Sequence, residues 1–253
     1  MHRRPRPFLV ASALALGLAA GPAAAFDPAN MSEAERGALR AEIRAYLLEN
    51  PQVIYEAAAI FEEQQAALQA EADVARARAN ADDLFNDPTA WVGGNPDGDV
   101  TMVEFLDYRC GFCRRAHHEI EALLAEDGNL RFIIKEFPVL GDQSVLASRF
   151  ALATRAVAGD AAYKQVHDAL IALDGPLSPP RLAEVAQALS LDGVEIMARM
   201  DGDDITAILR ENEMLAQRLQ INGTPSFVIG DQMVRGFRPM EEMQEIVEAV
   251  RAE

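Results

Sequence analysis

Cys110-Gly111-Phe112-Cys113 contains the only two cysteines of the 253-residue chain. It follows Val100 to Leu106, an apolar, β-branched segment that is typical of a buried strand. It precedes Arg114 to Leu124, which has good helix formers and neither Gly nor Pro. The first thiol then lies at a helix N-terminus, where unpaired N–H groups and the macrodipole favour the thiolate that attacks disulfides. The second thiol, one turn along, can resolve a mixed disulfide, so the stretch predicts a redox-active dithiol.

Two other uses of these cysteines are open at this point. A structural disulfide would close a very short loop and would stabilise the fold little. A zinc site needs more ligands than one cysteine pair, although His117 lies four residues beyond Cys113 on the same helical face and makes a Cys, Cys, His set geometrically possible. We favour redox chemistry over both uses and expect no resident metal and no cofactor.

The first 25 residues have the pattern of a secretory signal peptide. Three arginines at positions 3, 4 and 6 precede an apolar run from Phe8 to Leu18, and Ala23-Ala24-Ala25 forms a small-residue cleavage site before Phe26. The apolar run is too short to anchor the chain across a bilayer. An exported dithiol protein meets an oxidising compartment, and we expect that compartment to be the bacterial periplasm.

The charge of the chain limits its partners. The formal net charge is −17, and removal of the three arginines in the signal segment would make the mature protein still more acidic. Such a chain is unsuited to nucleic acid and to anionic membrane surfaces.

Residues 26–83 are predicted to form a helical oligomerisation region. Ser32-Glu33-Ala34-Glu35 is a capping-box pattern and predicts a helix through about Glu49. Asn50-Pro51 predicts the start of a second helix, which extends to about Asp82. A heptad pattern in this helix predicts self-association, although the helix could instead lie on its own domain. The pattern consists of Ile54, Phe61, Leu68 and Ala75, each followed four residues later by Ala58, Gln65, Ala72 and Ala79.

The pattern of strands and helices in residues 84–253 predicts an α/β domain with a thioredoxin-like fold. Asn86-Asp87-Pro88 ends the long helix, and Gly93 to Gly98 is predicted to be a turn cluster. Leu130 to Phe137 is a second strand pattern, which completes a β-α-β unit around the dithiol and favours a parallel pair.

The rest of this domain combines an inserted helical domain with a β-hairpin and a closing helix. The insertion, about residues 143–220, is expected to break at Gly159-Asp160, at Asp174-Gly175-Pro176 and at Asp192-Gly193. The hairpin comprises Ser226 to Ile229 and Met233 to Arg235, and the final helix spans Pro239 to Ala252.

Several separated elements in this order resemble the DsbA-like thiol:disulfide interchange proteins. They are Val103-Glu104-Phe105 before the dithiol, the helical insertion, and Gly223-Thr224-Pro225-Ser226-Phe227 after it. The N-terminal helices, with Ile43 to Leu48 and Asn50 to Ile54, resemble the ScsC (suppressor of copper sensitivity) and Com1-like branch. That resemblance implies that the N-terminal region builds a homo-oligomer, with a trimer expected and a dimer as the alternative.

The resemblance implies a role for each residue of the site. Cys110 would be the exposed nucleophile and Cys113 the buried resolving thiol. Glu104 would be a buried acid whose raised pKa lets it exchange protons with Cys113. The substrate-binding residues would be Thr224, which exchanges backbone hydrogen bonds with a bound peptide, the cis proline Pro225, and Gly111 and Phe112 between the cysteines.

The two residues between the cysteines bear on the direction of the reaction. DsbA-like oxidases have Pro-His there, whereas Gly111-Phe112 is closer to the Gly-Tyr of DsbC-like isomerases. Phe112 cannot donate a side-chain hydrogen bond to the thiolate, which favours a less oxidising couple. We therefore expect a disulfide isomerase or reductase that acts on exported proteins. A dithiol oxidase, and a Cu(I)-binding copper-tolerance protein that uses the same soft thiolates, are the alternatives.

The redox partner differs between these alternatives. An isomerase or reductase would be kept reduced by a membrane protein of the DsbD or ScsB type, whereas an oxidase would be recharged by a DsbB-like oxidant.

Overall fold

The computed structural model describes residues 28–252, and the predicted signal segment lies outside this range. The chain divides into two compact units, Met1–Phe61 and Glu62–Glu253. In the described residues of the first unit, a short 3-10 turn, Pro28–Asn30, precedes helix α1, Glu33–Glu49, and the first turns of α2, which spans Gln52–Ala79. The predicted capping box is confirmed, because the Ser32 hydroxyl accepts the N–H of Glu35 and the Glu35 carboxylate accepts the N–H of Ser32. Helix α1 buries none of its residues.

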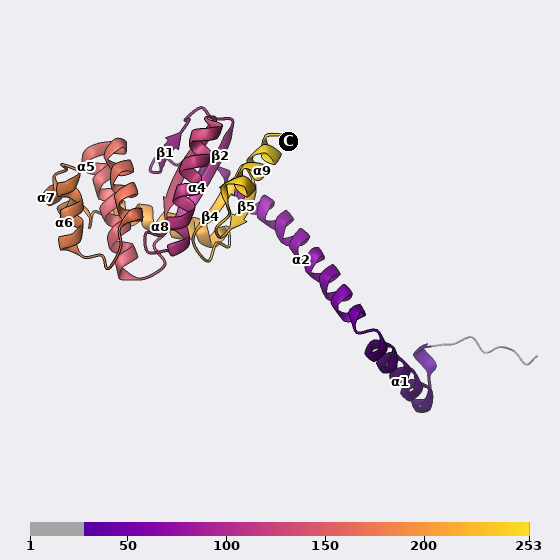
Figure 1. Ribbon diagram of the computed structural model, residues 1–253. Helices are drawn as coiled ribbons and strands as arrows, with labels where there is room; N and C mark the ends of the chain where they lie inside the picture. The colour runs from indigo at the N-terminus through magenta and orange to yellow at the C-terminus, as the bar shows by residue number, and fades with distance from the viewer. Residues whose placement is uncertain (1–27, 253) are drawn as a thin grey trace, which may run out of the picture. The chain divides into compact units, whose positions relative to one another are not determined.

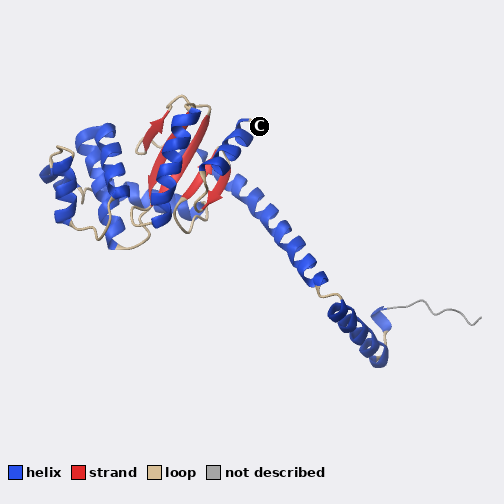
Figure 2. Cartoon of the chain, in the orientation of Figure 1, coloured by secondary structure: helices blue, strands red, loops and turns tan. Residues whose placement is uncertain are grey.

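The second unit contains a sheet with helices packed around it (Figures 1 and 2). Among the described residues, its strands have the order β1-β3-β2-β4-β5. Strands β2 and β3 are parallel, as the β-α-β pattern predicted, and the other three pairs are antiparallel. The strands are β1, Trp91–Gly94; β2, Val100–Leu106; β3, Leu130–Glu136; β4, Ser226–Ile229; and β5, Gln232–Arg235.

Strand β1 corrects the sequence prediction, which placed a turn cluster from Gly93 onward. Trp91 to Gly94 pair with β3 in antiparallel register. A Cβ atom at Gly93 would lie 2.1 Å from the Trp91 indole, so the glycine is required for the ring to pack against the strand rather than for a turn. The indole N–H also donates to the backbone oxygen of Asp160 at 3.1 Å.

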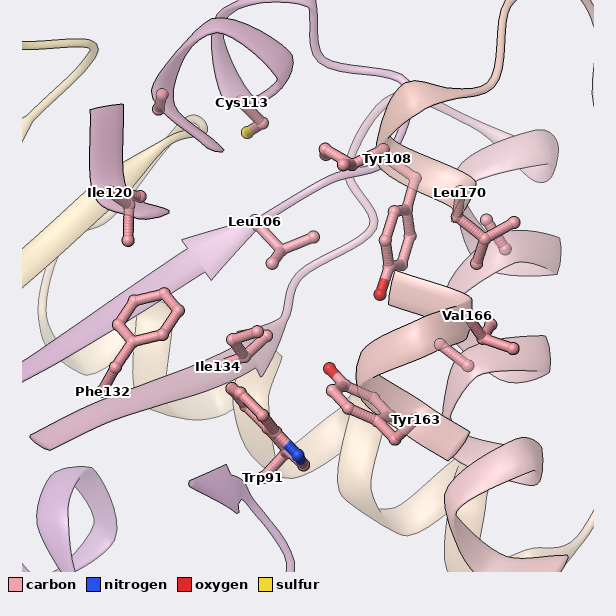
Figure 3. Packing of buried hydrophobic residues seen from close by; sticks show 14 of the residues in the cluster. Trp91, Leu106, Tyr108, Cys113, Ile120, Phe132, Ile134, Tyr163, Val166 and Leu170 are labelled. Atoms are coloured by element: carbon pink, nitrogen blue, oxygen red, sulfur yellow. The ribbon is translucent and has the colours of Figure 1, made fainter. Parts of the chain in front are cut away.

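Side chains of β2 and β3 alternate between two buried layers. Met102, Leu106, Phe132 and Ile134 pack with helices α4 and α5, whereas Val103, Phe105 and Ile133 pack with the last turns of α2 and α8. Figure 3 shows part of the first layer, where Phe132, Ile134 and Trp91 lie below Leu106 and Cys113. Both faces of the sheet are therefore covered. The remaining helices of the unit are α3, Ala81–Phe85; α4, Gly111–Asp127; α5, Asp142–Ala172; α6, Pro179–Ala188; α7, Gly193–Arg199; α8, Asp203–Arg218; and α9, Met240–Arg251.

The helical insertion has the predicted breaks. Helix α5 is interrupted at Gly159, whose φ of 82° is left-handed, and α7 begins at Gly193 with Asp192 as its N-cap. Among the described helices, none is long and apolar enough to cross a membrane.

The last turns of α2 belong to the second unit and pack against its sheet. Asp73 and Ala77 are buried there, and the Asp73 carboxylate accepts hydrogen bonds from Arg76 and from Arg235 of β5. The alternative that this helix lies on its own domain is therefore correct for its last turns. The seam residues Ile54, Phe61 and Leu68 stay exposed. Helix α2 ends at Ala79, slightly earlier than predicted.

Candidate active site

Cys110 is the N-cap of α4 and follows β2 after a three-residue connection. Asp107 fixes that connection, since one carboxylate oxygen accepts the N–H of Arg109 at 2.7 Å and the other accepts the N–H groups of Val139 and Leu140 at 2.8 and 2.9 Å. The same carboxylate thus joins the loop after β2 to the loop after β3, which holds the dithiol in a fixed position at the carboxyl end of the central strand.

The two thiols are reduced and differ in their surroundings. Cys110 is 7 % exposed and Cys113 is 1 % exposed. The expectation of an exposed nucleophile is therefore wrong for this reduced form. The loop before β4 covers the Cys110 sulfur, and the Cys110 thiol donates to the Thr224 carbonyl oxygen at 3.2 Å.

Hydrogen bonding favours the Cys110 thiolate. The pKa of Cys110 is lowered to about 5, chiefly by a hydrogen bond from the Cys113 side chain, although burial opposes the shift. The Thr224 side chain and the backbone N–H groups of Phe112 and Cys113 lower it further. Burial, and then the hydrogen bond to Cys110 and the charge of Glu104, raise the pKa of Cys113. The dithiol is therefore asymmetric, with a nucleophilic outer sulfur and a protonated inner one.

Glu104 lies in the middle of β2, paired with Ile134 on one side and Phe227 on the other. Its side chain is buried in the layer that contains Cys113. Burial, and then the charges of Cys110 and Glu136, raise the pKa of Glu104 to about 8. A carboxyl with this pKa exchanges protons readily near neutral pH.

The loop before β4 contributes the predicted proline. The peptide bond between Thr224 and Pro225 is cis, as the resemblance implied. The Pro225 carbonyl oxygen accepts the N–H of Gly236 at 2.9 Å, and the Ser226 hydroxyl donates to the Gly223 carbonyl oxygen at 2.8 Å. These bonds tie both ends of the loop in place beside Cys110.

The residues between the cysteines form the exposed side of the site. Phe112 is 56 % exposed, and the Arg115 guanidinium lies 5.7 Å from its ring centroid and 4.4 Å from that of Phe237. A Cβ atom at Gly111 would meet nothing within 4 Å, so packing does not require glycine there.

Among the described residues, Cys110, Cys113 and His117 do not gather into one cluster of ligand atoms with metal-ligand spacing. Within residues 28–252, the grouping with metal-ligand spacing comprises His117, His167 and Asp168, whose ligand atoms lie within 4.8 Å of one another. Lys164 contacts both Asp168 oxygens at 2.7 Å, so this carboxylate already has a cationic partner. His117 is 3.4 Å from the same carboxylate, in a helix-packing position.

Sequence reasoning missed a second buried acid, Glu136, at the end of β3. It is 1 % exposed and accepts hydrogen bonds from three hydroxyl groups. The sequence did contain an indication that Glu136 is buried, because this residue, like Glu104, is an acid in an otherwise apolar strand pattern. Its hydroxyl partners come from distant segments and had no sequence signature.

Comparisons with known proteins agree with this geometry. The protein-family model named DSBA-like thioredoxin domain matches residues 101–248. The family model named copper resistance protein ScsC N-terminal domain matches residues 35–67. A thioredoxin-like oxidoreductase from Silicibacter pomeroyi DSS-3 is 41% identical, with a TM-score of 0.65, over 68% of this chain and 98% of the other. A linker-deletion mutant of Proteus mirabilis ScsC is 26% identical, with a TM-score of 0.66, over 89% of this chain and 99% of the other.

Similarity to curated sequences extends to longer proteins. The chain is 27% identical over 169 residues to Na(+)/H(+) antiporter NhaA 1 of Salinispora arenicola, an alignment that covers 62% of this chain and 24% of the other. The chain thus spans about a quarter of the length of the first curated relatives that it matches.

Proposed function

Because the chain belongs to the family of DSBA-like thioredoxin domains, we propose that it is a periplasmic thiol-disulfide oxidoreductase that isomerises or reduces disulfides of exported proteins. The observation that carries this proposal is the asymmetry of the dithiol. The pKa of Cys110 is lowered to about 5, whereas that of Cys113 is raised by burial. A reactive thiolate beside a protonated thiol is the arrangement that disulfide exchange requires.

The reaction proceeds in two exchanges. The Cys110 thiolate attacks one sulfur of a substrate disulfide, so that a mixed disulfide forms and the other substrate sulfur leaves as a thiolate. In reduction, Cys113 loses its proton and attacks the Cys110 sulfur, which releases the second substrate thiolate and transfers two electrons from the dithiol to the substrate. In isomerisation, a substrate thiolate attacks instead, and the dithiol returns unchanged.

The exposed Phe112 ring supports the isomerase or reductase direction. It offers no hydrogen-bond donor to Cys110, and an aromatic ring beside the thiolate provides an apolar contact for an unfolded substrate. Thr224 and Pro225 lie next to the Cys110 sulfur and would bind the substrate backbone as an added extended segment.

A dithiol oxidase is the second candidate, and the low pKa of Cys110 favours it. Stabilisation of the thiolate stabilises the reduced form and makes the couple more oxidising. The redox state of the dithiol in freshly lysed cells separates the two. A mostly reduced dithiol indicates an isomerase or reductase with a DsbD- or ScsB-like partner, and an oxidised one indicates an oxidase with a DsbB-like partner.

The exposed apolar side chains of the first unit support a homo-oligomer. In α1 they include Leu39, Ile43, Tyr46 and Leu48, and in the first half of α2 they include Ile54, Tyr55, Ile60 and Phe61. Apolar surface of this extent marks an interaction site. A trimer, or alternatively a dimer, would place several dithiols around one substrate, which suits repeated attack on its disulfides.

The test of assembly is light scattering on the mature protein and on a deletion of residues 26–61. The deletion ends before Asp73 and Ala77, which are buried in the second unit. We expect the deletion variant to be a monomer that retains dithiol exchange and loses most isomerase activity. A monomeric mature protein contradicts the assembly, and undiminished isomerase activity in the deletion variant contradicts its purpose.

The test of the function is refolding of a substrate with scrambled disulfides in metal-free buffer. We expect activity that Cys110→Ser abolishes, whereas Cys113→Ser accumulates mixed disulfides on non-reducing gels. Equal residual activity in the two variants contradicts the assigned roles. Loss of activity on chelation would instead favour copper handling by the same thiols.

A further inference from the structure

Glu136 and Glu104 face the same buried layer. In the parallel register of β2 and β3, Glu104 pairs with Ile134 and Leu106 pairs with Glu136, so the two acids lie diagonally on neighbouring strands, two positions apart, on the side of α4 and α5. Neither acid takes part in an ion pair among the described residues. We call Glu104 and Glu136 the carboxyl pair.

Three hydroxyl groups surround one member of the pair. Tyr108 and Tyr163 each donate to one Glu136 oxygen at 2.7 Å, and Ser148 donates to the other at 2.7 Å. Figure 3 shows the Tyr108 and Tyr163 hydroxyls, from the loop after β2 and from α5, pointing toward one another. We call these three residues the hydroxyl cage. Within the described part of the chain, the Glu104 carboxyl receives no comparable hydrogen bond.

This difference decides where a single negative charge resides. Two carboxylates close together in a low-dielectric interior repel one another, so one of them retains a proton. Hydroxyl donors stabilise the charged form that accepts their hydrogen bonds. We propose that Glu136 is a positioning residue for disulfide exchange: its hydroxyl cage holds the negative charge of the carboxyl pair and thereby leaves the proton on Glu104, beside the cysteines.

The electrostatics of the pair support this order of protonation. Burial raises the pKa of Glu136 to about 7, although the hydrogen bonds of the cage oppose the shift. The pKa of Glu104 is raised further, to about 8, through burial and the nearby charges of Cys110 and Glu136. Because the two groups interact, their protons leave in two coupled steps that belong to the pair.

The other titratable groups around the pair do not supply a competing charge partner. Burial lowers the pKa of His167 to about 3, so this ring, 3.2 Å from the Tyr108 hydroxyl, stays neutral near pH 7. Lys135 points to the opposite layer and contacts Asp87. The remaining titratable groups that face the pair are Asp107 and Tyr108 after β2, Cys110 and Cys113 at the start of α4, and Tyr163 on α5.

This role of Glu136 rests on the proposed thiol-disulfide exchange. It means that the proton exchanged with Cys113 during the reaction is held by Glu104. When a substrate thiolate opens the Cys110–Cys113 disulfide, Cys113 leaves as a thiolate and takes the Glu104 proton. In the reverse direction, the Glu104 carboxylate takes the proton of Cys113, which attacks the Cys110 sulfur and expels the substrate thiolate. This resolution step accelerates as the pH rises through the pKa of Glu104.

The test is the pH dependence of resolution in the full mature protein. Reduced protein is mixed with a fluorogenic disulfide peptide, and acid quenching separates formation of the mixed disulfide from its resolution. Without a charge on residue 136, Glu104 loses its proton more easily, so Glu136→Gln should move the midpoint for resolution to lower pH by about one unit. Tyr163→Phe, which weakens the cage, should move the midpoint in the same direction by less.

Two further variants separate this role from a structural one. In a Glu104→Gln background, Glu136→Gln should cause no further shift, because its effect acts through Glu104. The matched control is Asp73→Asn, which neutralises a buried carboxylate remote from the dithiol and should leave the midpoint in place. An unchanged midpoint in Glu136→Gln, or an equal shift in the Glu104→Gln background, overturns the inference. A wild-type protein that forms no mixed disulfide at any pH overturns the proposed function instead.

Discussion

Lys135 and Glu136 are neighbours at the end of β3, but their side chains enter opposite layers of the domain and are stabilised differently. In the layer of α2 and α8, Lys135 contacts the Asp87 carboxylate, and Asp73 contacts Arg235. In the layer of α4 and α5, Glu136 is buried with three hydroxyl partners, and Glu104 is buried without a comparable hydrogen bond. Among the described residues, no ion pair neutralises either acid. Paired buried charges maintain a structure, whereas an unpaired buried acid retains a pKa near neutrality and can transfer protons.

The largest effect should come from the acid nearest the dithiol. Glu104→Gln removes the group that exchanges a proton with Cys113, and we expect resolution of the mixed disulfide to slow about a hundredfold. Attack by Cys110 should change much less, because hydrogen bonds from Cys113 and Thr224 stabilise its thiolate. Rapid-quench kinetics separate the two steps. If both steps slow equally, Glu104 has a structural role like that of the paired charges on the other face.

The opposite layer should show the reverse behaviour. Lys135→Met leaves Asp87 without its cationic partner and should lower the free energy of unfolding by about 2 kcal/mol. Exchange kinetics should be unchanged, since Lys135 faces away from Cys113. Urea unfolding monitored by circular dichroism gives the stability. A variant of normal stability with impaired exchange would remove the distinction between the two faces.

The smallest effect is expected at the end of α2. Burial raises the pKa of Asp73, but hydrogen bonds and charge, chiefly from Arg235, more than offset this and hold the pKa below its ordinary value. Asp73→Asn should cost about 1 kcal/mol, because Arg235 is more than a third exposed and solvent screens the pair.

The pH dependence of that variant has a definite sign. A carboxylate whose pKa is lower in the folded protein stabilises the fold above its unfolded pKa, and this stabilisation is lost as the pH falls through the folded value. The stability difference between wild type and Asp73→Asn should therefore shrink below about pH 4. Denaturant titrations at several pH values measure it. A difference that grows on acidification contradicts the assigned ion pair.

The sequence revealed the parts of the site that are local in the chain. Cys110, Cys113 and Glu104 lie within one strand–helix segment, and the cis proline Pro225 was recognised through family resemblance. Strand β1 was missed because its glycines indicate a turn, whereas Gly93 makes room for the Trp91 indole.

The environment of Glu136 could not be predicted in the same way. Its partners Tyr108, Ser148 and Tyr163 come from the loop after β2 and from two turns of α5, and only the folded chain brings them together. The depth of Cys110 was also misjudged, because the carbonyl that covers its sulfur belongs to Thr224, more than a hundred residues away. Long-range contacts of this kind leave no periodic pattern in the sequence.

The claim that Cys110 is the activated nucleophile is tested most directly by measuring the pKa of its thiol. This pKa is obtained from the ultraviolet absorbance of the thiolate as the reduced protein is titrated. Cys113 stays protonated over the relevant range because burial raises its pKa, so a single transition should report Cys110. We predict a midpoint near pH 5. A midpoint near the ordinary thiol value of about 8.5 would show that Cys110 is not activated, and would contradict its assignment as the nucleophile.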